Sequence, residues 1–541
     1  MRHALSLTPM RPSDSVRGNS ERSARTQGGE HLSVTEEAHQ HADVRDLARF
    51  GYKQELRRAL GVYSSFAVAF SYISPSTGIF TLYALGLGIG GPAFIWSWPI
   101  VVIGQLIIGL NFAEVSSHFP VAGSVYQWTK YLSNRTYSWF TGWIYLFAGV
   151  LTVTAVDVTV PIVLIPLLNS LGMNIENNSQ SQITIALIVL TSTTLLNIFG
   201  VRLVAIVNNT GVVFEILGMV VFAIVLLLFY AQQSPGVVFD TTELNASGNP
   251  WGTFMAAMFM SLFVIYGFDT ASTLAEETKN PRREAPRAVI AAIVGAAIIG
   301  AIFLFATLLA IPGNIHDYVT AIGKGEAAPP VDIITGNLPK WAADLYLFVV
   351  FAAIYVCCLA IQTSTIRLAF GMARDGNLPL GRIYNKVSPT LHTPVGTCIV
   401  IGGLSAIPLL YYAGAGLIAI AATGMIYLSY ILGNIAILIA RTQGWPKESA
   451  PFKLGSWGLI VNVLGLVWGI SMIVNFMWPR ASSNPPLSAL PNLSITGFLG
   501  DVPIFEATLF VIVVVGAIYY FIALRGKPSA AAIAPAAQAG D

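Results

Sequence analysis

Apolar runs of about 20 residues recur along the whole chain and constrain its fold more than any other feature, because each is long enough to cross a bilayer as a helix. Only 10% of the 541 residues are charged and 55% are hydrophobic, whereas a soluble domain carries about 25% charged residues. The sequence therefore predicts an all-α polytopic membrane protein with twelve transmembrane helices. The predicted spans are 58–87, 92–116, 137–168, 181–201, 204–230, 251–277, 287–312, 341–372, 394–412, 416–440, 456–479 and 503–525.

Lys and Arg are distributed unequally between the two sides of these spans. If the N-terminus is placed inside, only Lys324, Lys340 and Arg480 fall in outer connections, and the inner connections hold most of the others. The positive-inside rule relates such an excess to the cytosolic side. We therefore expect a protein of the cytoplasmic (plasma) membrane with both termini in the cytosol.

The first span contains the sequence SYISPSTGIF, Ser71–Phe80, where hydrocarbon-compatible residues would be expected. Pro75 lacks a backbone N–H and clashes with the preceding turn, and Gly78 is a weak helix former. Side chains that compete for backbone hydrogen bonds surround them, namely Ser74, Ser76 and Thr77. These residues predict that span 1 unwinds at about 73–78.

A second interruption lies in span 6, where Gly267 and Asp269 alternate with Tyr266 and Phe268. The two interruptions are about 190 residues apart, with five spans in each half, as an inverted repeat requires. Freed backbone groups are tolerated in a membrane only where protein or a wet cavity satisfies them. The sequence therefore predicts a five-plus-five inverted-repeat core with discontinuous helices 1 and 6, followed by two C-terminal helices.

This pattern divides the chain into five parts. Residues 1–50 are polar and have no apolar core of a signal peptide, so we expect a disordered cytosolic tail. The other expected parts are a first repeat at 51–230, a second repeat at 231–440, two further spans at 441–525 and a second disordered cytosolic tail at 526–541.

The ends of the broken helices indicate a substrate site. Free N–H groups at the start of the outer half of span 1 suit a carboxylate, and free carbonyls near Ile73, Ser74 and Tyr266 suit an ammonium group. Such a site would recognise a zwitterion such as an amino acid. A kinked structural helix is the alternative, but two corresponding breaks favour the binding site. The candidate substrate-binding residues are Ile73, Ser74, Ser76, Thr77, Gly78, Tyr266, Gly267, Phe268 and Asp269.

Three longer motifs carry a family resemblance. The segments NFAEVSSHFPVAGSVYQWTKYL, YGFDTASTLAEETKNPRREAPRAV and RLAFGMARDGNLPLGRIYNKVSPTLHTPV resemble the amino acid–polyamine–organocation superfamily, and most of all its amino acid/choline transporter branch. The resemblance covers about residues 50–525. It implies twelve helices with a LeuT-like inverted-repeat core, alternating access, and substrate bound between spans 1, 3, 6 and 8.

Charged residues near the inner ends of the spans indicate a cytosolic gate. Glu276 and Glu277 end span 6, and Arg282 and Arg283 follow in the next connection. Opposite charges at this density could close the cytosolic mouth, or they could orient the protein and contact anionic lipid. Glu114, near the inner end of span 2, is expected to bind gate backbone or an arginine rather than substrate.

Carboxylates inside the spans are costly and are candidates for function. Asp269 could hold a substrate amine, organise the unwound backbone, or cap the inner half-helix. Asp157, in span 3, could attract a cationic substrate, carry a proton, or make a polar contact to another helix. These alternatives stay open for each residue.

Glu215 in span 5 occupies a position where many relatives in the superfamily have a lysine that stands in for sodium. Because this sequence departs from that pattern, Glu215 could either carry a coupling proton or share a sodium site with hydroxyls of span 8. The hydroxyl candidates are Thr363, Ser364 and Thr365.

These observations predict a secondary active transporter that moves an amino acid or related amine, coupled to H⁺ or Na⁺ or working by exchange. A choline, polyamine or 4-aminobutyrate permease is the alternative within transport, and a membrane nutrient sensor that does not transport is the alternative outside it. The sequence has no recognisable catalytic triad, metal cluster or phosphate-binding loop. We therefore predict no enzyme activity, no cofactor and no metal, and expect a small-molecule substrate and the lipid bilayer, not nucleic acid, as partners.

Overall fold

The computed structural model describes residues 43–411, 415–478, 494–497 and 500–526. The chain divides into two units, Met1–Lys53 and Gln54–Asp541. In the first unit, residues 43–49 are helical. Most of both predicted tails, 1–50 and 526–541, lies outside the described residues. The helices that are long and apolar enough to cross a membrane lie in the second unit.

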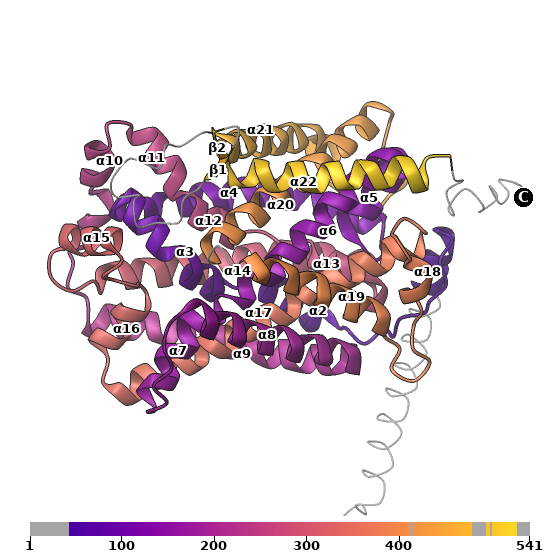
Figure 1. The fold of residues 1–541 in the computed structure, drawn as a ribbon. Helices are drawn as coiled ribbons and strands as arrows, with labels where there is room; N and C mark the ends of the chain where they lie inside the picture. Colours follow the sequence, from indigo (N-terminus) through magenta and orange to yellow (C-terminus); the bar gives the residue numbers. More distant parts are fainter. Residues whose placement is uncertain (1–42, 412–414, 479–493, 498–499, 527–541) are drawn as a thin grey trace, which may run out of the picture. The chain divides into compact units, whose positions relative to one another are not determined.

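Helices make up nearly all of this unit (Figure 1). The first half contains α2 (Val62–Ile73), α3 (Pro75–Gly90), η1 (Pro92–Trp96), α4 (Ser97–His118), α5 (Ser124–Leu132), α6 (Arg135–Asp157), α7 (Val160–Ser170), α8 (Ser179–Phe199) and α9 (Val201–Phe229). The second half begins with η2 (Pro235–Phe239), α10 (Thr242–Ala246), α11 (Pro250–Ala257), α12 (Phe259–Val264), α13 (Thr270–Thr273), η3 (Ala275–Glu277) and α14 (Pro281–Leu309).

The rest of the described chain is also mainly helical. It contains α15 (Ile315–Lys324), α16 (Val331–Asn337), α17 (Lys340–Arg374), α18 (Gly381–Tyr384), α19 (Val395–Ala406), η4 (Ile407–Tyr411), α20 (Ala415–Thr442), η5 (Gly455–Trp457), α21 (Gly458–Met477), α22 (Ile504–Tyr519) and η7 (Tyr520–Leu524). One antiparallel hairpin, β1 (Ser494–Gly497) with β2 (Gly500–Pro503), was not predicted from the sequence.

Ten helical segments among the described residues are long and apolar enough to cross a membrane. Two shorter apolar helices, Pro250–Val264 and Val395–Leu410, overlap predicted spans 6 and 9. The first is short because span 6 is interrupted after Val264. The polytopic helical fold is therefore confirmed, and the exact count of twelve stays a prediction.

Asparagine side chains fix the starts of several helices. Asn134 accepts a hydrogen bond from the Tyr137 N–H at the start of α6, and Asn178 does the same for Ser181 in α8. Such caps satisfy N–H groups that have no partner inside the helix. The residue that fixes the start of each of these helices is thus its immediate neighbour in the sequence.

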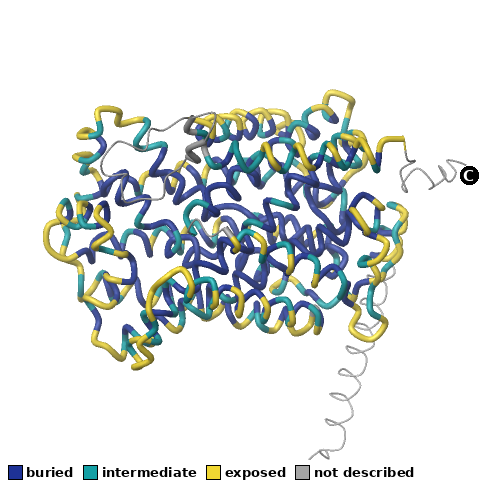
Figure 2. The backbone as a smooth tube through the Cα atoms, in the orientation of Figure 1, coloured by how far each residue is buried: buried dark blue, intermediate teal, exposed yellow. Residues whose placement is uncertain are grey.

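The broken first span lies in the centre of the bundle and other helices surround it. In its most apolar window, Val62–Gly90 is 89% buried, whereas Ile504–Leu524, which contains α22, is 22% buried. Figure 2 shows buried backbone in the interior and exposed backbone on outlying helices such as α21 and α22. Apolar side chains on these outlying helices suit contact with lipid.

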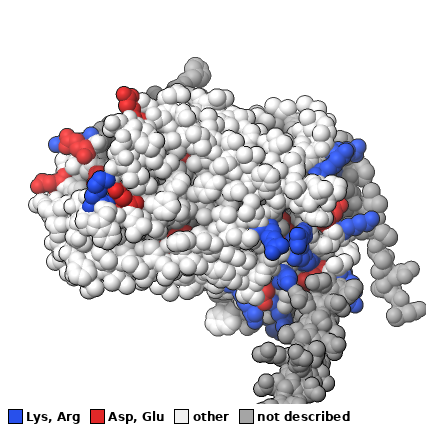
Figure 3. Space-filling model, turned by 90° about the horizontal axis from the view of Figure 1, so that it is seen from below, with Lys and Arg blue, Asp and Glu red and all other residues white. Residues whose placement is uncertain are grey.

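Charges collect at the two ends of the helices. In Figure 3, Lys and Arg gather toward the end where Figure 1 places α5 and α18, and Asp and Glu are prominent toward the end of α10, α15 and α16. A broad band with few charges separates them. This band is the surface expected of a membrane-embedded zone.

Candidate functional site

The first break is a single residue long. α2 ends at Ile73, Ser74 takes the left-handed conformation with φ 34° and ψ 86°, and α3 begins at Pro75. Proline suits the first position of a helix because its missing N–H would have no helical partner there. The Ser74 hydroxyl accepts a hydrogen bond from the Thr77 N–H at 3.3 Å. The break is therefore shorter than the predicted 73–78, because Pro75 starts a new helix at once.

The second break is longer. The backbone leaves helical geometry after Val264 and resumes it at Thr270. Gly267 has φ +82°, and its N–H donates a hydrogen bond to the Tyr430 hydroxyl at 2.9 Å. Within the described part of the chain, the carbonyls of Ile265 and Tyr266 accept no hydrogen bond. Free acceptors are thus present at this break.

The two breaks contact one another. A Cβ atom placed on Gly78 would lie 2.5 Å from Cγ2 of Val264, the last residue of α12. A Cβ on Gly267 would lie 1.8 Å from Cδ1 of Tyr72, near the end of α2. The rings of Tyr72 and Tyr266 meet edge to face, with centroids 6.1 Å apart. Glycine at both positions lets the broken helices approach this closely.

Glu215 reaches the first break from α9. Its Oε1 accepts hydrogen bonds from the hydroxyls of Ser74 at 2.7 Å and Ser76 at 2.6 Å, and from the Ser76 N–H at 3.3 Å. Glu215 is 2% exposed. A carboxylate therefore lies at the N-terminal end of α3, where the helix dipole favours negative charge.

The hydroxyls of span 8 bond elsewhere and not to Glu215. Thr363 donates to Asn197 Oδ1 at 2.8 Å, Ser364 accepts from Thr270 at 3.3 Å, and Thr365 donates to the Ile361 carbonyl at 2.9 Å. The residue of α17 that does reach the first break is Cys357, whose thiol donates to the Tyr72 carbonyl at 3.5 Å.

Asp269, in the second break, accepts three hydrogen bonds. The hydroxyls of Ser124, Tyr145 and Tyr430 each donate to its carboxylate at 2.5 Å. These donors belong to α5, α6 and α20, so one fully buried carboxylate joins the unwound segment to three other helices. Tyr430 also accepts the Gly267 N–H, so this network reaches the unwound backbone, and the three roles considered for Asp269 stay predictions.

Asp157 has different surroundings at the end of α6. It is fully buried, and neither carboxylate oxygen has a hydrogen-bond partner among the described residues. The Cys358 thiol of α17 lies beside it. This thiol belongs to another helix, so all three alternatives for Asp157 stay predictions.

Ion pairs close the inner end of the broken span 6. Arg374 binds both oxygens of Glu276, with N–O distances of 2.7 and 2.9 Å, and the Ala122 N–H donates to the same carboxylate at 3.1 Å. Arg367 Nε donates to Glu277 Oε1 at 2.5 Å, and each of these two side chains is 1% exposed. Both arginines belong to α17, so these pairs join span 6 to span 8.

The other gate candidates lie around α4. Glu114 pairs with Arg441 of α20 and accepts the Leu454 N–H at 2.9 Å. Arg282 Nε donates to the Ser117 carbonyl at 3.1 Å. Arg283 is exposed and joins no ion pair within the described ranges.

The segment before α2 also binds this inner end. The N–H groups of Ala59 and Leu60 donate to the Glu277 carbonyl, and the Lys279 N–H donates to the Leu60 carbonyl. Arg58 adds a bond to the Thr278 carbonyl at 2.7 Å. The inner ends of the two broken spans are thus held together by backbone pairing.

Sequence reasoning missed several of these partners. Ser124, Tyr145, Tyr430, Arg374 and Cys357 bond to the breaks or to the gate carboxylates. Tyrosine is common inside apolar spans, so the sequence did not indicate that Tyr145 and Tyr430 bind Asp269.

Two broken helices in contact, inside an apolar bundle with ion pairs at one end, agree with the transporter class that the sequence predicts. The family model for amino acid permease matches residues 60–500. The chain therefore belongs to the amino acid permease family and is an integral membrane protein.

Curated relatives agree with this assignment. The chain is 27% identical over 473 residues to amino-acid permease BAT1 of Arabidopsis thaliana, covering 80% of this chain and 88% of that protein. A homologue from Oryza sativa subsp. japonica is 29% identical over 467 residues, covering 81% and 88%. The branched-chain amino acid permease BcaP of Bacillus subtilis is 25% identical over 448 residues, covering 80% and 92%.

The predicted transporter class and superfamily are thus confirmed. The relatives bear the names of permeases for amino acids, and their names describe transporters rather than enzymes. The narrower resemblance to the choline branch stays a prediction.

Proposed function

We propose that this protein moves an amino acid across the plasma membrane by alternating access, coupled to protons through Glu215. The observation that carries the proposal is the position of Glu215, whose carboxylate bonds to Ser74 and Ser76 at the break of span 1. A protonatable group thereby contacts the element that would bind substrate.

The two breaks offer complementary groups to a zwitterion. The unpaired carbonyls of Ile265 and Tyr266 suit an ammonium group, and the N-terminal end of α3 suits a carboxylate. The names of the relatives support an amino acid as the substrate. 4-Aminobutyrate carries the same two charges, whereas choline lacks the carboxylate that the α3 end would bind.

Coupling follows from competition at the start of α3. In this conformation Glu215 accepts the Ser76 N–H, so an ionised Glu215 occupies part of the site for a substrate anion. A proton on Glu215 removes its charge and weakens these charge-assisted bonds. The helix end then becomes available to the substrate carboxylate, so proton and substrate bind together.

Sodium coupling has less support. Sodium is a hard cation that prefers oxygen ligands, yet Cys357 presents a thiol to the Tyr72 carbonyl at the first break. The hydroxyls of Thr363 and Thr365 are bonded away from Glu215. Exchange without net proton movement is the remaining alternative.

The proposed orientation places the basic end in the cytosol. Lys and Arg gather at the end of the helices that carries α5 and α18 (Figure 3), which the positive-inside rule assigns to the cytosol. Epitope tags on both termini should be detected only after the membrane is permeabilised. Detection of either tag on intact cells would contradict this orientation.

Uptake into proteoliposomes tests the function. A panel of amino acids, choline, polyamines and 4-aminobutyrate is offered under an inward proton gradient and then under a sodium gradient. We expect an amino acid to accumulate with the proton gradient alone. Glu215→Gln should lose this accumulation and keep exchange of labelled for unlabelled substrate, while Glu326→Gln, at an exposed site, should match the wild type.

Three results would contradict the proposal. Proton-driven accumulation retained by Glu215→Gln would remove Glu215 from coupling. Accumulation driven by sodium would assign the coupling ion differently. Saturable binding without accumulation would identify a sensor rather than a transporter.

A further inference from the structure

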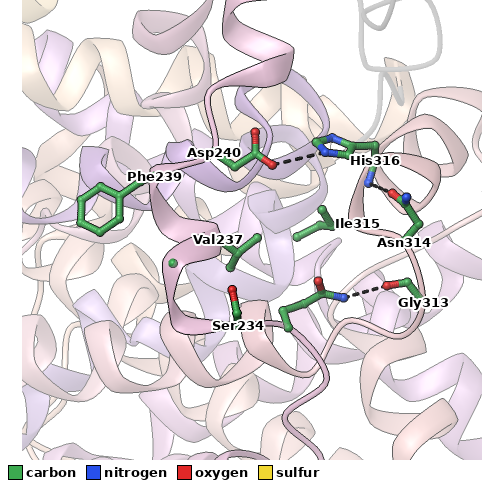
Figure 4. Close-up of a pocket in the computed structure, with 10 residues that line it drawn as sticks. Ser234, Val237, Phe239, Asp240, Gly313, Asn314, Ile315 and His316 are labelled. Atoms are coloured by element: carbon green, nitrogen blue, oxygen red, sulfur yellow. Dashed lines mark hydrogen bonds and ion pairs between the residues drawn. The ribbon is translucent and has the colours of Figure 1, made fainter.

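Two connections meet at the end of the bundle that is proposed to face outward, next to α3, the second half of the broken first span. One follows α9 and contains η2 and α10, and the other follows α14 and leads into α15. Residues of both line a cavity of about 560 Å³, and Figure 4 draws these lining residues. The imidazole of His316 lies at this junction beside Asp240.

The capping geometry of α15 presents His316 to the other connection. The Asn314 side chain accepts hydrogen bonds from the N–H groups of His316 at 2.8 Å and Asp317 at 3.4 Å. His316 is therefore fixed in the first turn of the helix, and its side chain reaches across to the connection after α9 (Figure 4).

Both ring nitrogens of His316 face a carboxylate oxygen. Nδ1 lies 2.6 Å from Glu243 Oε1, and Nε2 lies 3.3 Å from Asp240 Oδ2. A neutral imidazole has one N–H, so one of these contacts would set a lone pair against a carboxylate. The doubly protonated ring donates a hydrogen bond from Nδ1 to Glu243 and presents positive charge to Asp240 in an ion pair, so the geometry favours an imidazolium.

We propose that His316, Asp240 and Glu243 form a proton-dependent outer clasp that ties α15 to the connection after α9 and loosens as the external pH rises. The clasp is a regulatory site separate from Glu215. It rests on the proposed function only in that the outer end is taken to face the extracellular medium.

Fixed hydrogen bonds accompany the clasp. The N–H groups of Gln232 and Gln233 donate to the Leu309 carbonyl, and the Gln233 side chain donates to the carbonyls of Ile311 and Gly313, each at 2.8 Å. None of these groups titrates near neutral pH. They hold the base of the junction, so protonation of His316 affects the attachment of α15 rather than the whole fold.

The attachment matters because both clasped elements pack on α3. Contacts join α10 to α3 and α15 to α3, and α3 is the half-helix that begins at the first break. A pH-dependent bond between α10 and α15 therefore bears on the outer part of the transport pathway.

The charges around His316 set the direction of the pH dependence. The facing groups are the carboxylates of Glu243 and Asp240 on the other connection and Asp317 on α15 itself. The hydrogen bond to Glu243 raises the pKa of His316, and the nearby negative charges add to this against a smaller opposing effect of burial. Since the pKa is raised on folding, the stabilisation is complete below the unfolded value of about 6.5 and is lost as pH rises through the higher folded value.

Hydrogen exchange of the full chain in nanodiscs tests the clasp locally. Protection of the α15 amides, corrected for the intrinsic effect of pH, should fall roughly two- to fivefold as pH rises from about 5.5 to 8.5, the range expected for a partly exposed ion pair. His316→Gln should show the lower protection at every pH. Glu243→Gln should move the midpoint to lower pH, because the charge on Glu243 raises the histidine pKa.

His392→Gln is the matched control, since His392 is an exposed histidine in the connection before α19. It should keep the wild-type profile. A pH-dependent fall that persists in His316→Gln, or wild-type protection that does not change with pH, would overturn the clasp. Because exchange is measured without transport, failure of uptake with an intact exchange profile would count against the proposed function and not against the clasp.

Discussion

The backbone of Gly267 lies against the ring of Tyr72, so close that a Cβ on Gly267 would fall 1.8 Å from the Tyr72 Cδ1 atom. Gly267 also has a positive φ of +82°, a conformation that costs other residues energy. Tyr72 belongs to span 1 and Gly267 to span 6. The close contact between the two broken helices at this point therefore requires glycine at position 267.

We predict that Gly267→Ala abolishes uptake, because the added methyl group must displace the Tyr72 ring and strain the backbone. Surface labelling should still find the protein in the membrane. The control is Gly403→Ala on α19, where a Cβ meets nothing within 4 Å. Normal uptake by Gly267→Ala would show that the close contact of the breaks is not needed for transport.

A second prediction concerns Gly78 and Val264. A Cβ on Gly78 would lie 2.5 Å from Val264 Cγ2, so Gly78→Ala should lower the initial rate of uptake strongly. The double variant Gly78→Ala, Val264→Ala lacks Val264 Cγ2, the atom in the clash, and should regain part of the uptake rate. If the double variant is no better than the sum of the single effects, the two positions are not coupled.

A third prediction concerns the buried pair of Arg367 and Glu277. Arg367→Met leaves the Glu277 carboxylate buried without its counter-charge, and breaking such a pair costs about 3–5 kcal/mol. We expect a clearly lower midpoint of thermal unfolding, partly restored by adding Glu277→Gln. Arg287→Met is the control, because Arg287 is 71% exposed in its pair with Glu284 and should cost less than about 1 kcal/mol. Equal effects of the two arginine variants would contradict this prediction.

A fourth prediction concerns the donors to Asp269. Tyr430→Phe removes a donor to Asp269 and the acceptor of the Gly267 N–H. Leaving buried polar groups unpaired costs about 1–3 kcal/mol each, so the free energy of unfolding should decrease by a similar amount. Tyr427→Phe is the comparison, because the hydroxyl of this buried tyrosine has no hydrogen-bond partner in the described part of the chain. A smaller loss for Tyr430→Phe than for Tyr427→Phe would argue against the Asp269 network.

The positions of the breaks were readable from the sequence because their causes are local. Pro75 cannot continue a helix, and Gly267 supplies the backbone freedom that the second break uses. The length of the first break was overestimated, since the pattern of Ser74 to Gly78 does not reveal that Pro75 begins the next helix immediately.

Partners distant in the sequence were not readable. Glu276 and Glu277 were placed in the gate, but Arg282 and Arg283 were the candidates near them, whereas the structure pairs the carboxylates with Arg374 and Arg367 of α17. Likewise, Glu215 bonds to hydroxyls of the first break and not to those of span 8. Such choices depend on how helices rotate against one another, and hydropathy does not encode that rotation.

Only Ser74 separates α2 from α3, so very few backbone torsions link the two half-helices of the first span. Swinging α2 relative to α3 then requires turning about only a few backbone bonds, and little chain entropy changes when it does so. Under the proposed alternating access, the contacts that must change are therefore those that hold the two half-helices to their neighbours, such as the bonds of Glu215 at the joint and of Leu60 to Glu277.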